Sequence, residues 1–389
     1  MAAAAPASSL ADHVTGYDTI ALALQGGGAL GAYQAGVYEA LDEAGIVPNR
    51  LSGISIGALN AAIIAGNPPE RRVERLHEFW DTICSAPPGA PWIDSGNWPA
   101  GLAERLGELS AWRTVLAGQP GFFHPRILPP VGFGLRTTPD QVSWYDTAPL
   151  RGTLERLVDF DRLNDARALH LVVSAVNVRT GNFTRFDNRR QRLGAEHFMA
   201  SGALPPGLPP IAIDGEYYWD GGVVSNTPLY EVLQEGHPGR NTLVFQVDLW
   251  SAHGALPHDL MEAAERRKEI QYSSRTRFFT EFVRHTQEQR RLVHDLMALV
   301  PEAQRGKAAY RRAEAQQSAV LTNVIHLIYT NKSSGAHFRD FEFGRDGMRK
   351  HWQAGLEDMR HTLSHPDWLT PPSPEQPFVT HDLHRVERA

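Results

Sequence analysis

The chain of 389 residues contains a single cysteine, Cys84, and it lacks an apolar run of the length that a membrane-spanning helix requires, about 18–20 residues. One cysteine cannot form an internal disulfide, so the fold does not depend on an oxidising compartment. An excess of basic residues is also missing, because 44 acidic residues outnumber 38 basic ones and the net charge is −6. The composition therefore carries no general signature of a nucleic-acid-binding protein.

The start of the chain lacks the positively charged region of a signal peptide, and its apolar stretch is short. We therefore expect residues 1–18 to form a flexible tail on a cytoplasmic protein, and we leave attachment to a membrane surface open. What the sequence does contain is ample apolar material, 42% of its residues. The length suits about two domains, or one large domain with an appendage.

Short apolar runs alternate with helical patterns along much of the chain. Five runs predict buried strands: 19–24, 51–53, 169–178, 241–250 and 323–331. Residues 183–186 predict the second arm of a hairpin. Helical spacing follows the first run over 32–45, and good helix-forming residues follow the second over 58–65. This alternation predicts an α/β fold with a mainly parallel sheet.

Two parts of the chain differ from this pattern. Residues 85–149 are crowded with proline, glycine and aromatic residues, which is typical of a lid-like insertion but also of a large packed loop. From about residue 257 the chain becomes helical and charged, and it ends in a proline-rich tail. We expect a main domain over 19–256, with the insertion at 85–149, and a mostly helical C-terminal extension over 257–389.

The first motif is Gly53-Ile54-Ser55-Ile56-Gly57, which matches the G-x-S-x-G nucleophile elbow. A strand must turn sharply into a helix there, so the flanking residues must be small and the serine hydroxyl projects. The context fits, because an apolar run precedes the motif and a helical stretch follows it. A helix N-terminus at Ser55 would also stabilise developing negative charge. The alternative is a tight turn with a buried serine.

The second motif is the glycine-rich loop 26–31, GGGALG, between the first strand and the first helix. It fits the G-x-G-x-x-G pattern of dinucleotide-binding folds. However, the acidic residue expected about 20 residues later is missing, since residues 46–52 read IVPNRLS. A run of amides at a helix start can instead hold an oxyanion. A dinucleotide site, an oxyanion hole and a turn without a ligand all remain open on this motif alone.

The third motif is Asp220-Gly221-Gly222, at the end of a short aromatic strand. Asp-Gly strongly favours an Asx-type turn, which is the structural explanation. A carboxylate beside a serine nucleophile can instead act as its base. Because the ordinary pKa of aspartate is about 3.9, burial or tight positioning would have to improve it as a base.

Together, the order and spacing of the motifs resemble the patatin-like phospholipase family of serine lipid acyl hydrolases. The resemblance covers roughly residues 19–250. The matching segments are ALALQGGGALGAYQAGVYEAL, GISIGALNAAIIAG, MASGALPPGLPPIAIDG and YYWDGGVVSNTPL. The resemblance implies a three-layer α/β/α fold with a Ser–Asp dyad and no catalytic histidine. In this sequence Ser55 would be the nucleophile and Asp220 its general base.

The resemblance also implies an oxyanion hole in the loop that contains Gly26, Gly27, Gly28 and Gly31, with the amides of Gly27 and Gly28 as donors. Residues 197–210 would line the carboxyl edge of the sheet near the dyad. One position departs from the family pattern, because Leu30 stands where many members carry Arg or Lys. A direct side-chain contact to a phosphate headgroup is therefore in doubt. The part after residue 257 resembles the extension of a bacterial subgroup.

We therefore expect a serine lipid acyl hydrolase, a phospholipase, lysophospholipase or esterase, that needs neither a cofactor nor a metal. Its partner would be a lipid or acyl-ester substrate, with contact to a membrane surface in addition and no nucleic acid. The alternatives are an acyltransferase on the same site, an oxidoreductase that binds a dinucleotide at GGGALG, and a non-catalytic binding protein. A Ser–His–Asp triad would instead recruit a histidine after Asp220, such as His253 or His326.

Overall fold

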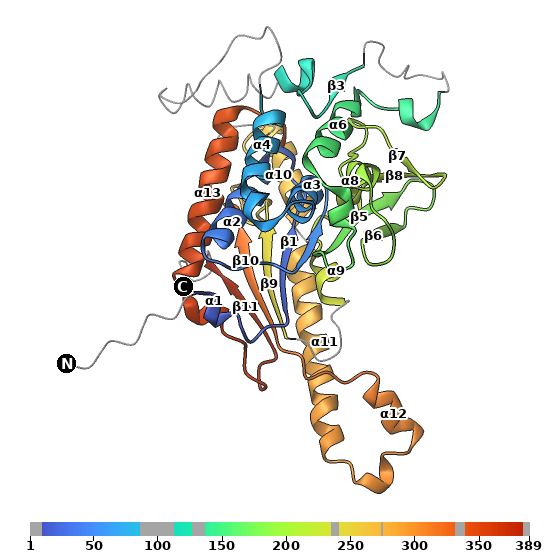
Figure 1. Cartoon of the computed structure of the whole chain (residues 1–389), viewed down its shortest axis with the longest axis vertical. Helices are drawn as coiled ribbons and strands as arrows, with labels where there is room; N and C mark the ends of the chain where they lie inside the picture. Colours follow the sequence, from blue (N-terminus) through green and yellow to red (C-terminus); the bar gives the residue numbers. More distant parts are fainter. Residues whose placement is uncertain are drawn as a thin grey trace, which may run out of the picture.

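The computed structural model describes residues 10–85, 113–126, 137–234, 241–273, 275–330 and 339–383. Its centre is one nine-stranded sheet. The strands are β1 (Thr19–Leu24), β2 (Arg50–Gly53), β5 (His170–Asn177), β6 (Phe183–Asp187), β7 (Ile211–Ile213), β8 (Glu216–Asp220), β9 (Thr242–Asp248), β10 (Thr322–Ile328) and β11 (Phe378–Asp382). Their order is β11-β10-β9-β1-β2-β5-β8-β7, with β6 paired to β5 (Figure 1). From β11 to β5 all pairs are parallel, whereas β6, β7 and β8 run antiparallel.

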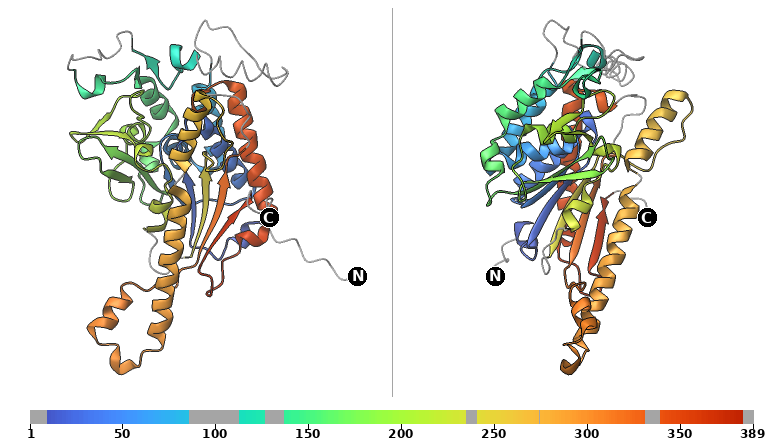
Figure 2. Two further views of the ribbon diagram at one scale, coloured as in Figure 1. Left: turned by 180° about the vertical axis from the view of Figure 1, so that it is seen from behind. Right: turned by 90° about the vertical axis from the view of Figure 1, so that its right-hand side faces the viewer.

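Helices cover both faces of this sheet, and alternate residues of β1 point to opposite sides. Leu22 and Leu24 join the large core on one face, whereas Ala21 and Ala23 join a smaller core on the other. The first face carries α2 (Ala32–Glu43), α3 (Ile56–Ala65), α4 (Arg72–Ile83), α6 (Ala148–Leu157), α8 (Ala195–Ser201) and α13 (Arg345–Leu363). The second carries α9 (Leu229–Gln234) and α11 (Arg275–Ala298) (Figure 2). The result is the expected α/β fold with a mostly parallel central sheet.

The shorter elements lie around these layers. The short ones are α1 (Leu10–His13), α7 (Phe160–Leu163), α12 (Ala308–Glu314) and the two-stranded ribbon β3 (His124–Pro125) with β4 (Tyr145–Asp146), and the longer helix α10 (Leu260–Ser273) lies outside the layers as well. The lower end of α11 and α12 project away from the sheet as an arm (Figure 1). No helix in the described ranges combines the length and apolarity that spanning a bilayer would require.

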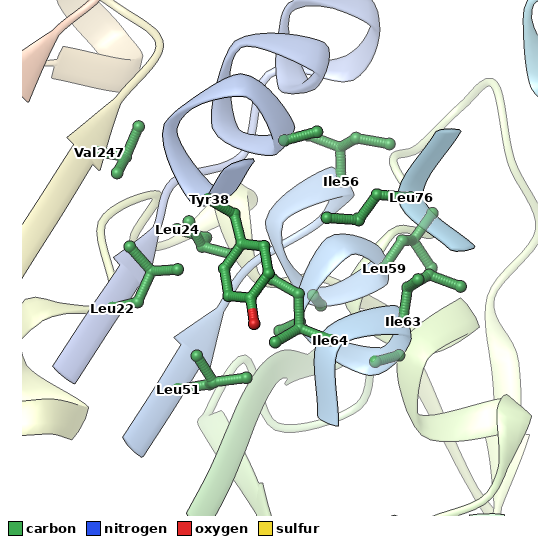
Figure 3. Packing of buried hydrophobic residues seen from close by; sticks show 14 of the residues in the cluster. Leu22, Leu24, Tyr38, Leu51, Ile56, Leu59, Ile63, Ile64, Leu76 and Val247 are labelled. Carbon is green, nitrogen blue, oxygen red and sulfur yellow. The ribbon is translucent and has the colours of Figure 1, made fainter. Parts of the chain in front are cut away.

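Helix α3 lies in the dense part of the core. All ten residues of α3 are buried, as expected for a helix that is apolar all round. Figure 3 shows this helix between Leu22, Tyr38 and Leu51 of β1, α2 and β2 on one side and Leu76 of α4 on the other. Because several elements surround α3, its first turn has a fixed place at the carboxyl edge of the sheet.

The C-terminal segment is part of the same layered structure. β10 and β11 extend the sheet beyond β9, and α13 lies along α2. The two helices touch at glycines: a Cβ on Gly36 would lie 2.0 Å from the Trp352 carbonyl oxygen, and one on Gly355 would lie 2.0 Å from that of Tyr33. The Tyr33 hydroxyl donates to Asp358 at 2.7 Å. The sequence pattern changes near residue 257, but strands from both sides of this position belong to the same sheet.

The predicted strands are confirmed, with ends that shift by at most three residues. Strand β11 was not predicted, because it lies in the proline-rich end of the chain. Within the expected N-terminal tail, residues 1–9 lie outside the described ranges, but residues 10–13 form α1 and Val14 and Tyr17 are buried. The Tyr17 hydroxyl accepts a hydrogen bond from the Asn323 side chain at 3.0 Å, which ties this segment to β10.

Candidate active site

The G-x-S-x-G motif forms a sharp turn between β2 and α3. Ser55 has φ 56° and ψ −127°, a region that non-glycine residues rarely occupy and that costs about 1–3 kcal/mol. A Cβ on Gly53 would lie 2.4 Å from the Gly57 carbonyl oxygen, and a Cβ on Gly57 would lie 2.2 Å from that of Leu24. Both flanking positions therefore require glycine. The turn presents the Ser55 side chain at the start of α3.

Hydrogen bonds from the neighbouring segment hold this turn in place. The Ser55 amide donates to the carbonyl and the hydroxyl oxygen of Ser201, each at 3.1 Å. The Ser201 hydroxyl in turn donates to the Ser174 carbonyl at 2.7 Å. The strained conformation is thus supported from β5 and α8. Within the stretch 197–210 that the family resemblance places near the dyad, residues 202 and 204–208 line the same pocket as Ser55.

Asp220, the last residue of β8, meets Ser55 at the same edge. This residue is 2% exposed, it accepts a hydrogen bond from the Gly222 amide at 2.7 Å, and it lines the same pocket as Ser55. Burial raises the pKa of Asp220 to about 7, although the Ser55 side chain and the Gly222 amide oppose this shift. Gly221 is needed for packing, since a Cβ there would lie 2.7 Å from the Ser174 carbonyl oxygen. The Asx-type turn and the contact with serine therefore occur together.

The glycine-rich loop borders Ser55 on its other side. A Cβ on Gly26 would lie 3.0 Å from the Ser55 Cβ. The Gly26 carbonyl accepts from the Asn226 side chain and the Trp250 indole N–H, both at 2.9 Å. In contrast, the amides of Gly27 and Gly28 donate to no group within the described ranges. Two unpaired amides beside a serine, at the start of a helix, can stabilise an oxyanion.

Gly31, the fourth glycine of the predicted oxyanion loop, has a different place. A Cβ on Gly31 would lie 2.5 Å from the Ile56 side chain, and its carbonyl accepts from Asn60 at 3.0 Å. It therefore packs the loop against α3 and does not line the pocket. The structure brings Gly26, Gly27 and Gly28 to Ser55, but not Gly31.

Ser55 and Asp220 face a pocket of about 190 Å³ whose walls are mainly apolar. Part of its lining comes from the predicted insertion, namely Phe122, Phe123 and Tyr145. Trp92, Trp98 and Trp112 of that insertion lie outside the described residues, and Trp144 is exposed. The glycine-rich loop, residues 202–208 and the C-terminal part of the chain complete the walls.

Sequence analysis missed several residues of this pocket. They are Asn226, Trp250, Tyr272, Asp340, Phe341 and Phe343. Asn226 lies six residues after Asp220, in one of the segments that resemble the family, and this closeness in sequence could have indicated that it lines the pocket. Tyr272 comes from the charged helix α10, and Asp340 and Phe341 come from the 3₁₀ turn η6 (Arg339–Phe341), which no local pattern links to Ser55. Only the tertiary fold brings these residues together.

The described histidines take no part in the pocket lining. His326 instead forms a 2.8 Å contact with Asp248, from β10 to β9. The described residues also include no group of three or more His, Cys, Asp or Glu side chains placed to hold a metal ion. The arrangement at Ser55 therefore offers a hydroxyl, a buried carboxylate and two free amides.

Comparisons with known proteins bear on this arrangement. The family model of patatin-like phospholipase matches residues 22–233, and a second model, described as patatin phospholipase, matches residues 270–375. The structure is similar to that of VipD from Legionella pneumophila, with a TM-score of 0.37 and 15% identity over 89% of this chain and 67% of that one. Human GIVD cytosolic phospholipase A2 gives a TM-score of 0.33 and 14% identity over 60% and 43% of the two chains. No curated protein matches.

The first family model covers more than half of the chain and includes all three motifs. The second covers most of the region after α10. The chain therefore belongs to the patatin-like phospholipase family, and this membership supports a lipid acyl hydrolase.

Proposed function

We propose that this protein is a serine lipid acyl hydrolase that releases a fatty acid from a phospholipid, a lysophospholipid or another lipid ester. One observation carries the proposal: Ser55 and the buried carboxylate of Asp220 lie beside each other at the wall of one apolar pocket. Paired with a base, a serine hydroxyl becomes a nucleophile toward an ester carbonyl. The pocket offers the water-poor surroundings that an acyl chain favours.

In the first half of the reaction, Asp220 removes the proton from the Ser55 hydroxyl as Oγ attacks the ester carbonyl carbon. A pKa near 7 suits this task, because a base is most effective when its pKa lies near the working pH. The negative charge that develops on the carbonyl oxygen is stabilised by the amides of Gly27 and Gly28. A donor of this kind typically contributes about 2.7–4 kcal/mol.

The tetrahedral intermediate then breaks its bond to the alcohol, which takes the proton from Asp220 and leaves an acyl-enzyme on Ser55. In the second half, Asp220 accepts a proton from water as the water oxygen attacks the acyl carbonyl. Collapse releases the fatty acid and returns the proton to Ser55 Oγ. If an alcohol replaces water in this half, the same groups perform acyl transfer.

The predicted insertion completes the proposal as a cover over the dyad. Phe122, Phe123 and Tyr145 line the pocket and suit contact with an acyl chain. The same part of the chain exposes 74% of Leu116 and 54% of Trp144. We include in the proposal that these two side chains contact a lipid surface, from which the substrate enters.

Fatty acid release from phospholipid vesicles tests the proposal. Ser55→Ala and Asp220→Asn should each reduce release by several orders of magnitude at unchanged secondary structure, because they remove the nucleophile and the base. His326→Ala is the matched control and should retain activity. Full activity in Ser55→Ala, or a loss in His326→Ala as large as in Ser55→Ala, would contradict the dyad. Adding a lysophospholipid as acceptor separates hydrolysis from acyl transfer, since transfer would produce diacyl product in place of free acid.

A further inference from the structure

The C-terminal turn η6 lies directly against the glycine-rich loop. A Cβ on Gly28 would lie 2.2 Å from the Asp340 carbonyl oxygen, so the two backbones are in close contact. Gly28 has φ 56°, a conformation that only glycine adopts readily. Asp340 and Phe341 of this turn also line the pocket. The placement of η6 therefore bears on the two free amides of Gly27 and Gly28.

Lys268 on α10 is the residue that holds this turn by charge. Its Nζ lies 2.6 Å from an Asp340 carboxylate oxygen and 3.2 Å from one of Glu265, and the three side chains are only 22%, 12% and 12% exposed. Burial lowers the pKa of Lys268, but the two carboxylates outweigh that effect and the pKa is raised. Lys268 is therefore a stable cation between two largely buried anions.

The same ammonium group also reaches the other side of the loop. It lies 5.8 Å from the centre of the Trp250 ring and 6.0 Å from that of Phe341, within the range of cation–π attraction. Trp250 donates to the Gly26 carbonyl. Lys268 thus contacts two residues, Asp340 and Trp250, that themselves touch the loop on either side of Gly27.

We propose that Lys268 is a positioning residue for the acyl-transfer reaction. Its ammonium group fixes Asp340, and with it η6, against Gly28, so that the amides of Gly27 and Gly28 keep their direction toward the reacting carbonyl. This inference rests on the proposed function. Without the cation, Asp340 and Glu265 would be two like charges in a largely buried site, and their repulsion would displace η6.

The same displacement would change the wall of the pocket. Phe343 follows η6 by two residues, and its ring centre lies 5.5 Å from that of Phe122 and 6.4 Å from that of Phe123. An aromatic cluster therefore joins the C-terminal segment to the insertion. Loss of Lys268 should thus affect both the rate of the chemical step and the binding of long acyl chains.

The test compares Lys268→Met with Arg266→Met, a control on the same helix. Arg266 pairs with Glu269 at 2.8 Å with side-chain exposures of 19% and 11%, so the two cations have similar burial and pairing. Arg266 contacts Ala252 and Gly254 and does not line the pocket. The readouts are kcat and KM for a short and a long p-nitrophenyl ester, with the melting temperature measured alongside.

Misplaced catalytic groups cost about 100-fold in rate for shifts near 1 Å, so Lys268→Met should lower kcat for the short ester roughly 10–100-fold. Lys268→Arg should restore most of it, because the charge is kept. Arg266→Met should keep a kcat within about twofold of the parent value, even if its melting temperature falls as much as that of Lys268→Met. Equal kcat losses in the two Met variants, following the melting temperature, would overturn the inference.

A milder variant covers the case in which Lys268→Met does not fold. Asp340→Asn removes one of the paired charges but keeps the size of the side chain, and we expect it to lower kcat by about 3–10-fold, since a charged hydrogen bond is exchanged for a weaker one. Parent kcat in Asp340→Asn would contradict the inference in that case. Ser55→Ala in the same assay separates the two proposals: residual turnover there refutes the proposed function, whereas parent-like Lys268 variants with an inactive Ser55→Ala refute only the positioning role.

Discussion

Replacing Asp220 by asparagine should make the protein more stable at alkaline pH while it abolishes activity. Burial raises the pKa of Asp220 from 3.8 to about 7, so the folded protein disfavours the charged carboxylate. At about 1.4 kcal/mol per pKa unit, the shift of roughly three units corresponds to about 4 kcal/mol of folding free energy. Asparagine has nearly the same shape and no charge, so the variant avoids this cost.

Because the pKa of Asp220 is raised in the folded protein, its contribution to the free energy of unfolding depends on pH in a defined direction. Below about pH 4 the carboxyl group is protonated in both the folded and the unfolded protein, and no cost arises. Between about pH 4 and 7 the unfolded chain loses this proton first, so the contribution of Asp220 to stability falls as the pH rises. Above about pH 7 the full cost is present. The advantage of Asp220→Asn should therefore grow from near zero to at most about 4 kcal/mol.

Urea unfolding of both proteins at several pH values between about 4.5 and 8.5 measures this difference. Asp165→Asn is a control of opposite sign, because backbone and side-chain hydrogen bonds from Arg167 lower the pKa of that exposed carboxylate. Because this carboxylate is ionised in both the folded and the unfolded protein above about pH 4.5, its variant should be less stable than the parent by a nearly constant amount across this range. A difference for Asp220→Asn that is constant across pH, or a variant less stable than the parent at about pH 8, would refute the burial argument.

Three further substitutions test the geometry. Gly28→Val should lower kcat at least 100-fold, because φ is positive and Asp340 occupies the Cβ position; parent kinetics would exclude an oxyanion role there. Gly355→Val should lower the free energy of unfolding in urea by about 3 kcal/mol or more, since its Cβ would lie 2.0 Å from Tyr33; parent stability would refute the close crossing of α2 and α13. Phe343→Ala should raise KM about tenfold for long-chain esters and leave KM for butyryl esters unchanged; equal changes would argue against an acyl-binding wall.

The features that were predictable from sequence are those fixed by neighbouring residues. The turn at Ser55 needs Gly53 because backbone atoms of the same strand–turn–helix unit occupy the space of a side chain, and it needs Gly57 because the Leu24 carbonyl of the adjacent strand β1 lies there. Buried strands such as β1 and β9 are short runs of apolar residues, and the parallel sheet follows from their alternation with helices. The meeting of Ser55 and Asp220 was inferred from family resemblance and not from spacing.

Features fixed by distant residues were not predictable. Asp340 lies 285 positions after Ser55, and nothing around it marks a pocket residue. Strand β11 was missed because it pairs at the edge of the sheet and only Phe378 of its five residues is buried, so its apolar pattern is weak. Gly31 matched the loop motif, yet it packs on α3, because a motif does not specify which glycines face a ligand.

The central claim is that Ser55 is the nucleophile activated by Asp220. Labelling with a fluorophosphonate, followed by mass spectrometry of the peptides, tests it most directly because the reagent forms a covalent bond with an activated serine. The account predicts a single modification on Ser55, no labelling of Ser55→Ala, and a labelling rate in the parent that rises with pH through about 7 as Asp220 loses its proton. Modification of another residue, or undiminished labelling of Ser55→Ala, would contradict it.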